Sequence, residues 1–234
     1  MLFRHKGMHN PTKNLTLSIG NEVIERIGQN SAEKQFKYLG HLIDENLSWS
    51  SHIRHVQNKI SCGNYLLARA KHDLPQNIKH LLYNTLIRPH LEYGILAWGG
   101  VAKSMLKGIV TIQKKAIRNI FCKKVNEHTA PLFSLLGELT LVDLFKYNCA
   151  VFMYKFNNRL LPTSFENVFT PCNPPNRTNS YKVVKNRISF LNQFPTSFLP
   201  KIWNALDRQL KFSSSLSIFK RKLKNSLLEP YDLT

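Results

Sequence analysis

Residues 103–124 read KSMLKGIVTIQKKAIRNIFCKK, and the spacing of their apolar side chains predicts a helix from about Lys103 to Lys123. With a rotation of about 100° per residue, one half of this helix is apolar. Basic residues share a narrow sector of the other half, with Thr111 between them: Lys103, Lys107, Lys114 and Arg118. Residues 101–124 contain seven basic residues, Lys115 among them, and no acid. Because a solvated helix usually mixes both signs of charge, a phosphate-contacting surface is favoured over an ordinary solvent face.

Helical spacing continues on both sides of this stretch. Pro75 opens an upstream helix with an apolar face, Pro89 kinks or ends it, and Gly99–Gly100 end the aromatic-rich stretch that follows. That apolar face consists of Ile78, Leu81, Leu82 and Leu86. Further helices are predicted at 50–70, at 130–136, from Thr140 to Pro162, at 200–210 and at 215–228. Residues 162–200 are predicted to be loop with short elements.

The first 45 residues show the alternation of apolar and polar side chains that is typical of strands. Residues 15–19 and 23–27 flank Gly20–Asn21, a dipeptide suited to a hairpin turn, and residues 36–43 form a further apolar run. The predicted fold class is therefore mostly α: a small N-terminal antiparallel hairpin or three-stranded sheet, a helical bundle and a helical C-terminal region. The predicted segments are 1–46, 47–125 and 126–234, the last with its irregular part at 162–200.

Basic residues outnumber acidic ones throughout the chain. The 234 residues contain 33 Lys and Arg against 14 Asp and Glu, a formal charge of +19. Such self-repulsion usually persists because a polyanion neutralises it, so nucleic acid is the first expected partner and an anionic membrane surface the second. Four more basic residues are predicted to contact nucleic acid: Arg177, Lys182, Lys185 and Arg187. Tyr181 and Phe190, which lie beside them, either stack on bases or belong to the core.

Targeting and redox features are sparse. The longest stretch without a charged residue, 188–200, is too short and too polar to span a bilayer, so no transmembrane segment is expected. No apolar signal follows the N-terminal charges, and the four cysteines lie far apart without a CxxC pair. We expect a reduced protein that stays inside the cell, in the cytoplasm or the nucleus, and is not secreted.

No known catalytic motif is found in the sequence. Polynucleotide transfer by two metal ions needs carboxylates that converge on one point, yet the only adjacent acids are Asp44 and Glu45. Asp44 is expected to cap or turn the chain. His52 and His55 are spaced to share a helix face, but no third metal ligand is evident. The residue chemistry therefore predicts a binding protein with no cofactor and no metal site.

Several longer segments resemble a known family in order and spacing. They are FKYLGHLIDENLSWSSHI at 36–53, LYNTLIRPHLEYGILAWG at 82–99, IQKKAIR at 112–118, WNAL at 203–206 and residues 219–231. Together they resemble the region that follows the metal-binding aspartates in reverse transcriptases of LINE-type, jockey-like non-LTR retrotransposons. The resemblance extends over nearly the whole chain.

The resemblance implies that the chain is a C-terminal fragment of an RNA-directed DNA polymerase. It implies that Tyr38, Leu39 and Gly40 form a primer-grip-like hairpin and that residues 53–123 form a thumb that holds RNA or an RNA–DNA duplex. It also implies that residues 1–46 are the remnant of a palm, and that the parent enzyme uses magnesium bound by palm aspartates that, like the fingers, are missing here. This chain alone is expected to be inactive.

Two other functions stay open at this point. One is a helical module that binds protein or membrane without catalysis. The other is a degenerate product without function, because the predicted sheet at residues 15–43 would expose an apolar face that the rest of a palm should cover.

Overall fold

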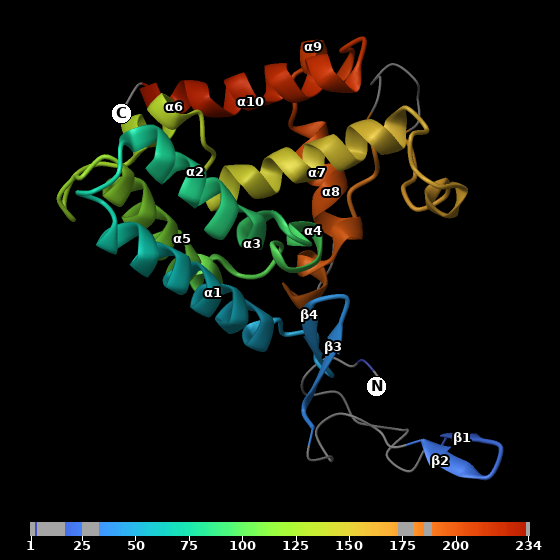
Figure 1. Cartoon of the computed structure of the whole chain (residues 1–234). Helices are drawn as coiled ribbons and strands as arrows, with labels where there is room; N and C mark the ends of the chain where they lie inside the picture. The colour runs from blue at the N-terminus through green and yellow to red at the C-terminus, as the bar shows by residue number, and fades with distance from the viewer. Residues whose placement is uncertain (1–2, 4–16, 25–32, 173–179, 185–188, 233–234) are drawn as a thin grey trace. The chain divides into compact units, whose positions relative to one another are not determined.

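The computed structural model describes residues 3, 17–24, 33–172, 180–184 and 189–232 (Figure 1). Contacts divide the chain into two compact units, residues 1–55 and 56–234. The strands are β1 (Leu17–Ile19), β2 (Glu22–Ile24), β3 (Gln35–Tyr38) and β4 (His41–Asp44). The first six helices are α1 (Ser50–Arg69), α2 (Gln76–Leu86), α3 (Arg88–Glu92), α4 (Ile95–Trp98), α5 (Lys103–Ile120) and α6 (Ala130–Leu136). The others are α7 (Leu141–Asn157), η1 (Thr163–Phe165), η2 (Ser189–Gln193), α8 (Pro195–Asn204), α9 (Arg208–Lys211) and α10 (Leu216–Asp232).

The predicted fold class is confirmed: two small antiparallel hairpins are followed by helices. The described strands do not form the three-stranded alternative, because β1 pairs only with β2 and β3 only with β4. Residues 36–43, expected as one strand, are themselves a hairpin. Its turn is Leu39–Gly40, with both residues at positive φ (43° and 80°). The rest of the predicted second strand, 25–27, lies outside the described residues.

The first turns of α1 pack on β4 within the first unit. The His52 ring is buried, and its Nε2 atom lies 3.3 Å from Nδ1 of His41. Trp49 contacts both rings edge-on. Burial and the neighbouring His41 and His55 lower the pKa of His52 to about 4.

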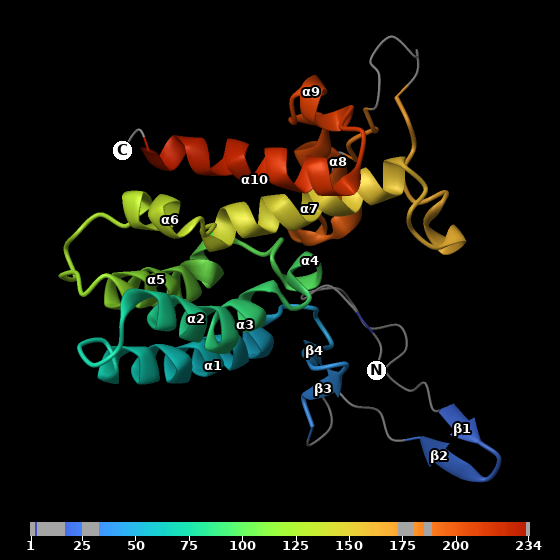
Figure 2. The same cartoon turned by 45° about the horizontal axis from the view of Figure 1, so that its top comes forward.

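In the second unit, α7 is the central helix. It packs against α8 and α10, and also against α3, α4 and α5 (Figures 1 and 2). Gly99 shows how close this packing is, because a Cβ atom there would lie 2.5 Å from the Phe145 ring of α7. The helix α4 ends at Trp98, directly before Gly99 and Gly100, as predicted. The missing side chain of Gly99 also allows α7 to pack closely there.

Two predicted helix details are wrong. The α2 face was expected to bury Ile78 and Leu81, but Leu81 is 56% exposed and the buried residues are Lys79 and Tyr83. Their polar atoms have internal partners: Lys79 Nζ donates to the Lys71 carbonyl (2.9 Å), and Tyr83 accepts from Gln113 (3.0 Å). Because these hydrogen bonds satisfy both groups, the helix can turn its polar side inward.

The second error concerns the C-terminal helices. The expected helix at 200–210 is two helices, and the first, α8, begins at Pro195, inside the segment predicted as loop. Pro195 occupies the first turn, where proline has no hydrogen bond to lose. Pro200 then lies inside α8, where the sequence had indicated a helix start.

The side-chain amide of Gln113 joins three parts of the second unit. Gln113 is 1% exposed, and its Nε2 donates to the Tyr83 hydroxyl and to the Leu139 carbonyl, both at 3.0 Å. Its Oε1 accepts from the Leu141 backbone N–H at 2.8 Å. One side chain of α5 is therefore bonded to α2 and to the chain that enters α7.

None of the described helices is long and apolar enough to cross a bilayer.

Replacing Gln113 by alanine should lower the free energy of unfolding by about 3 kcal/mol or more, because buried polar groups on three segments lose their partner. Urea unfolding followed by circular dichroism measures this loss. Thr111→Ala, on the exposed side of the same helix, is the control and should change stability by less than about 0.5 kcal/mol. A loss below about 1 kcal/mol for Gln113→Ala would show that the network does not hold the unit together.

Stability of the first unit should fall as the pH drops from about 6.5 to about 4. His52 is neutral in the folded chain and its pKa is about 4, so the unfolded chain takes up the proton first. The loss should reach a few kcal/mol at most and level off below about pH 4. NMR titration of the His52 ring and unfolding curves of His52→Gln test this. The variant should flatten the pH dependence, whereas His128→Gln, at an exposed position, should not; equal slopes would contradict the assignment.

Candidate nucleic-acid interface

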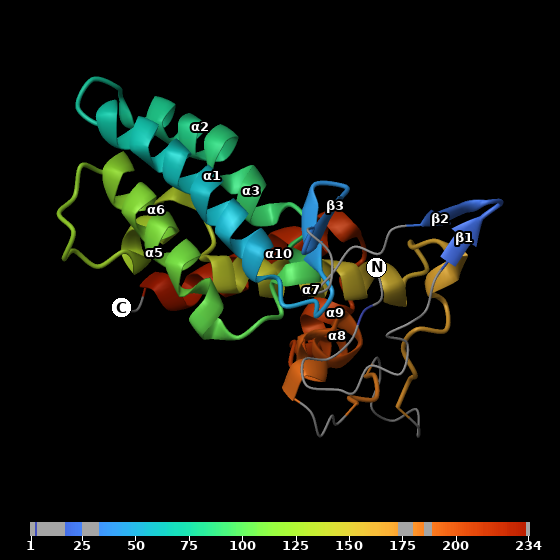
Figure 3. The same cartoon turned by 90° about the horizontal axis from the view of Figure 1, so that it is seen from below.

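Helix α5 has the two-sided character that its sequence predicts. Its apolar half is buried, with Ile109, Ala116 and Ile117 inaccessible to solvent. It packs on α2, α6 and α7. It also lies beside α1 (Figure 3), where Gly108 leaves room for Gln57 and the Asn119 amide donates to Asn64 at 3.0 Å.

The other half of α5 presents ammonium groups to solvent. Four exposed lysines make up what we call the α5 ridge: Lys103, Lys107, Lys114 and Lys115. Among the described residues, none of the four forms an ion pair with a carboxylate. The neighbouring α1 adds exposed Lys59 and Arg69, and neither helix contains an Asp or a Glu. The two helices therefore present positive charge without local compensation.

Arg118, predicted as part of the same surface, has a different environment. Its side chain is half-buried, and its Nε donates to the Glu127 carbonyl at 2.8 Å. Lys123 forms an ion pair with the Glu127 carboxylate at 3.1 Å. The backbone N–H of Lys124, followed by the Lys123 side chain, lowers the pKa of Glu127. Arg118 thus fastens the loop after α5, which the sequence pattern did not indicate.

The second predicted group of basic residues is described only in part. Lys182 is exposed, and its backbone N–H donates to the Thr170 carbonyl at 2.9 Å. The other three predicted contacts lie outside the described residues: Arg177, Lys185 and Arg187. Tyr181 is only 7% exposed and contacts Phe156 edge-on, so the core alternative holds for this ring. Phe190 is half-buried against Phe194.

The predicted primer-grip-like residues occupy the tip of a hairpin. Tyr38 is the last residue of β3, and Leu39 and Gly40 form the turn. The side chains of Tyr38 and Leu39 are exposed. The turn therefore presents an aromatic ring and an aliphatic side chain to solvent.

Among the described residues, the acids do not gather into a magnesium site for nucleotide transfer. Asp44 organises a turn, as predicted: its Oδ1 accepts from the Asn46 N–H (2.9 Å) and its Oδ2 from the Ser48 hydroxyl (2.8 Å). Across the described ranges, no three His, Cys, Asp or Glu side chains gather as metal ligands would. His52 contacts His41 and other aromatic rings.

Comparison with known proteins gives three curated relatives, all from mobile elements of flies. Two are RNA-directed DNA polymerases from the mobile element jockey, in Drosophila melanogaster and Drosophila funebris, 34% and 33% identical over 89 and 90 residues. The third is a probable RNA-directed DNA polymerase from transposon X-element of Drosophila melanogaster, 31% identical over 87 residues.

These alignments cover 36–37% of this chain and 10% of each relative. No family model matches, and no solved structure gives a significant match. The resemblance found in the sequence is thus confirmed over about a third of the chain: this protein is homologous there to the RNA-directed DNA polymerases of jockey-like mobile elements.

Proposed function

We propose that this chain is a nucleic-acid-binding portion of a retrotransposon RNA-directed DNA polymerase. It holds RNA or an RNA–DNA duplex through the α5 ridge. The observation that carries the proposal is the exposed half of α5, with four lysines and no acid, on a helix whose other half is fixed in the core. The homology to jockey polymerases supports it.

Contacts of this kind follow the nucleic-acid backbone. A lysine ammonium is a compact charge on a flexible stem that pairs with phosphate without reading base edges. Each phosphate contact releases counterions, so affinity falls steeply as salt rises. Binding through the α5 ridge is therefore weakly sequence-specific and strongly salt-dependent.

Catalysis in the proposed parent enzyme depends on residues elsewhere. We propose that the carboxylates for magnesium-dependent nucleotide transfer lie outside these 234 residues, because the acids among the described residues do not converge and the sequence has no motif of paired aspartates. The chain then contributes binding and positioning of the nucleic acid. Template-directed nucleotide incorporation by this chain alone would contradict this part of the proposal.

A second part of the proposal concerns the N-terminal hairpins. Ile19 is 75% exposed and Val23 is 70% exposed, and Tyr38 and Leu39 are exposed on the other hairpin. Two-stranded hairpins are marginal in water unless another surface covers their apolar side chains. We propose that the fingers and palm of the parent polymerase cover them, with Tyr38, Leu39 and Gly40 as a primer-grip-like turn.

Replacing the four lysines of the α5 ridge by glutamine should flatten the salt dependence of binding. The slope of log affinity against log salt should fall by about 0.7–0.9 per lost phosphate contact, and thus by about 3 in all. Fluorescence anisotropy with a labelled RNA–DNA duplex at several salt concentrations measures the slope. The unfolding midpoint should change little, because the four side chains are exposed.

The matched control removes the same amount of charge from another helix. Four basic residues of α10 serve: Lys220, Arg221, Lys222 and Lys224. Their replacement by glutamine should change the slope by less than about 1. Equal effects of the two quadruple variants would show that net charge, and not the α5 ridge, determines binding.

A further inference from the structure

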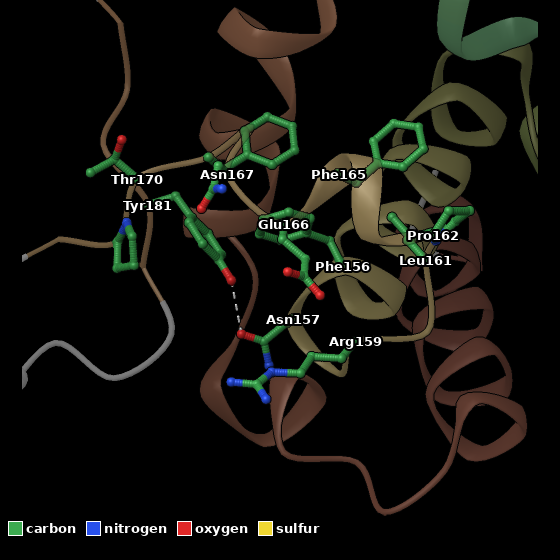
Figure 4. Close-up of a pocket in the computed structure, with 12 residues that line it drawn as sticks. Phe156, Asn157, Arg159, Leu161, Pro162, Phe165, Glu166, Asn167, Thr170 and Tyr181 are labelled. Carbon is green, nitrogen blue, oxygen red and sulfur yellow. Dashed lines mark hydrogen bonds between the residues drawn. The ribbon is translucent and has the colours of Figure 1, made fainter.

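A cavity of about 610 Å³ opens beside the C-terminal end of α7. The segment after that helix lines it, from Leu161 through η1 to Pro171, and Tyr181 forms one side; the other side is open to solvent (Figure 4). The volume lies within the range of small-molecule sites in proteins. Neither the sequence motifs nor the proposed duplex contact of α5 uses this cavity.

Aromatic rings form the apolar part of the wall. Phe156 contacts Tyr181 edge-on at 5.5 Å between ring centroids, and both belong to the packed core of the unit. Phe165 is 36% exposed, and an edge-on contact with Phe152 at 5.7 Å orients its ring. The cavity therefore offers fixed aromatic surface to a flat ligand.

Three polar side chains with complementary chemistry complete the wall. Figure 4 shows the Glu166 carboxylate reaching toward the middle of the cavity, with Asn157 and Arg159 along one edge. Asn157 Oδ1 accepts from the Tyr181 hydroxyl at 3.1 Å, which leaves its Nδ2 group to donate. Among the described residues, neither Glu166 nor Arg159 forms an ion pair.

Arg159 stands at a position where glycine is usual. The Leu160 N–H donates to the Lys155 carbonyl at 2.8 Å and the Arg159 N–H to the Phe156 carbonyl at 3.1 Å, the pattern of a Schellman helix end. The left-handed residue of that motif is Arg159, with φ of 53°. A side chain in this conformation costs about 1 kcal/mol relative to glycine. The Arg159 guanidinium therefore lies at the cavity edge, and its presence there lowers the stability of the helix end.

We propose that this cavity binds a guanine nucleotide, either free or as an unpaired residue of a nucleic acid strand. A carboxylate only accepts hydrogen bonds, and guanine is the base that presents two adjacent donors, N1–H and the 2-amino group, to one carboxylate. The base lies against the Phe165 ring with this edge toward Glu166. Arg159 and the Asn157 amide hold the phosphate.

The charges of the wall favour this ligand over an organic cation. Aromatic rings around a carboxylate also suit a quaternary ammonium group. Arg159, however, lies on the same wall, and the chain as a whole carries a charge of +19. A ligand that combines a donor edge with an anionic group satisfies both Glu166 and Arg159, whereas a cation satisfies only Glu166.

Calorimetric titration of the full chain with nucleoside monophosphates tests the base. GMP should bind at least about fivefold more tightly than IMP, which lacks the 2-amino group, and AMP should bind more weakly still, because its N1 atom accepts and does not donate. Glu166→Gln should remove most of the GMP-over-IMP preference. Glu229→Gln, the same change at an exposed site on α10, should leave it intact. Equal affinities for GMP and IMP, no detectable binding, or equal effects of the two variants would overturn the proposal.

Arg159 has its own test with a structural readout. Arg159→Gly should remove most of the advantage of GMP over guanosine, because the phosphate loses its charged partner and keeps only the Asn157 amide. The same change should raise the unfolding midpoint by about 2–4 °C, since glycine suits the left-handed position. Weaker GMP binding together with lower stability would show a merely structural role and would overturn the assignment of Arg159.

A third comparison separates the two sources of guanine and keeps this proposal apart from the duplex proposal. If the guanine belongs to a strand, a five-nucleotide RNA with one central guanine among uridines should bind more tightly than both all-uridine RNA and GMP. If the site takes the free nucleotide, GMP should bind at least as tightly as that RNA. The glutamine variant of the α5 ridge should keep the GMP-over-IMP ratio, and Glu166→Gln should keep the salt slope for duplex. Coupled loss of both properties would contradict a separate site.

Discussion

The second unit depends on one buried amide. Gln113 is enclosed by the core and bonded to a tyrosine hydroxyl, a carbonyl and an N–H that belong to other segments. A buried amide with every partner in place specifies one arrangement, because any rotation or slip of α5 would leave polar groups unsatisfied. The same constraint fixes which half of α5 faces water. The position of the α5 ridge is therefore a consequence of a contact on the opposite side of the helix.

Three described helices end at a residue in the left-handed conformation, which favours glycine. Both α6 and α7 end with a residue in the left-handed conformation, Gly137 in one and Arg159 in the other. Cys122 occupies the corresponding place after α5. Only Gly137 is without strain there. The α7 end keeps an arginine beside a cavity, and the α5 end keeps a cysteine whose sulfur lies 3.2 Å from the buried Lys79 ammonium.

Much of the fold follows from apolar spacing, and the errors have physical causes. The buried residues Val56, Ile60 and Leu67 of α1 lie at the spacing the sequence shows, and Ala130–Leu136 forms the predicted short helix. The α2 face was misassigned because Lys79 and Tyr83 find polar partners inside the unit, and those partners are 8 and 30 residues away along the chain. Periodicity alone cannot show such pairing. The start of α8 was missed because two prolines in one segment indicate loop more often than helix.

The candidate site was predictable only as a charge pattern. The acid-free face of α5 is visible in the sequence, and the structure places the lysines of that face on the exposed side of the helix. The role of Arg118 was not visible, because it depends on the path of the loop that brings the Glu127 carbonyl to it. The cavity beside α7 was also hidden, since it depends on how residues 156–171 fold back on themselves and on Tyr181.

The absence of acids from both α1 and α5 has a thermodynamic consequence. Two neighbouring helices of one charge sign repel each other, and the apolar contacts between them must overcome that repulsion. A polyanion that lay along both helices would neutralise them, and a preference for the folded chain over the unfolded one would shift the equilibrium toward the native state by mass action. If the proposed nucleic-acid partner has that preference, it would act as a folding cofactor as well as a ligand, and the compact state would be most stable when the partner is bound.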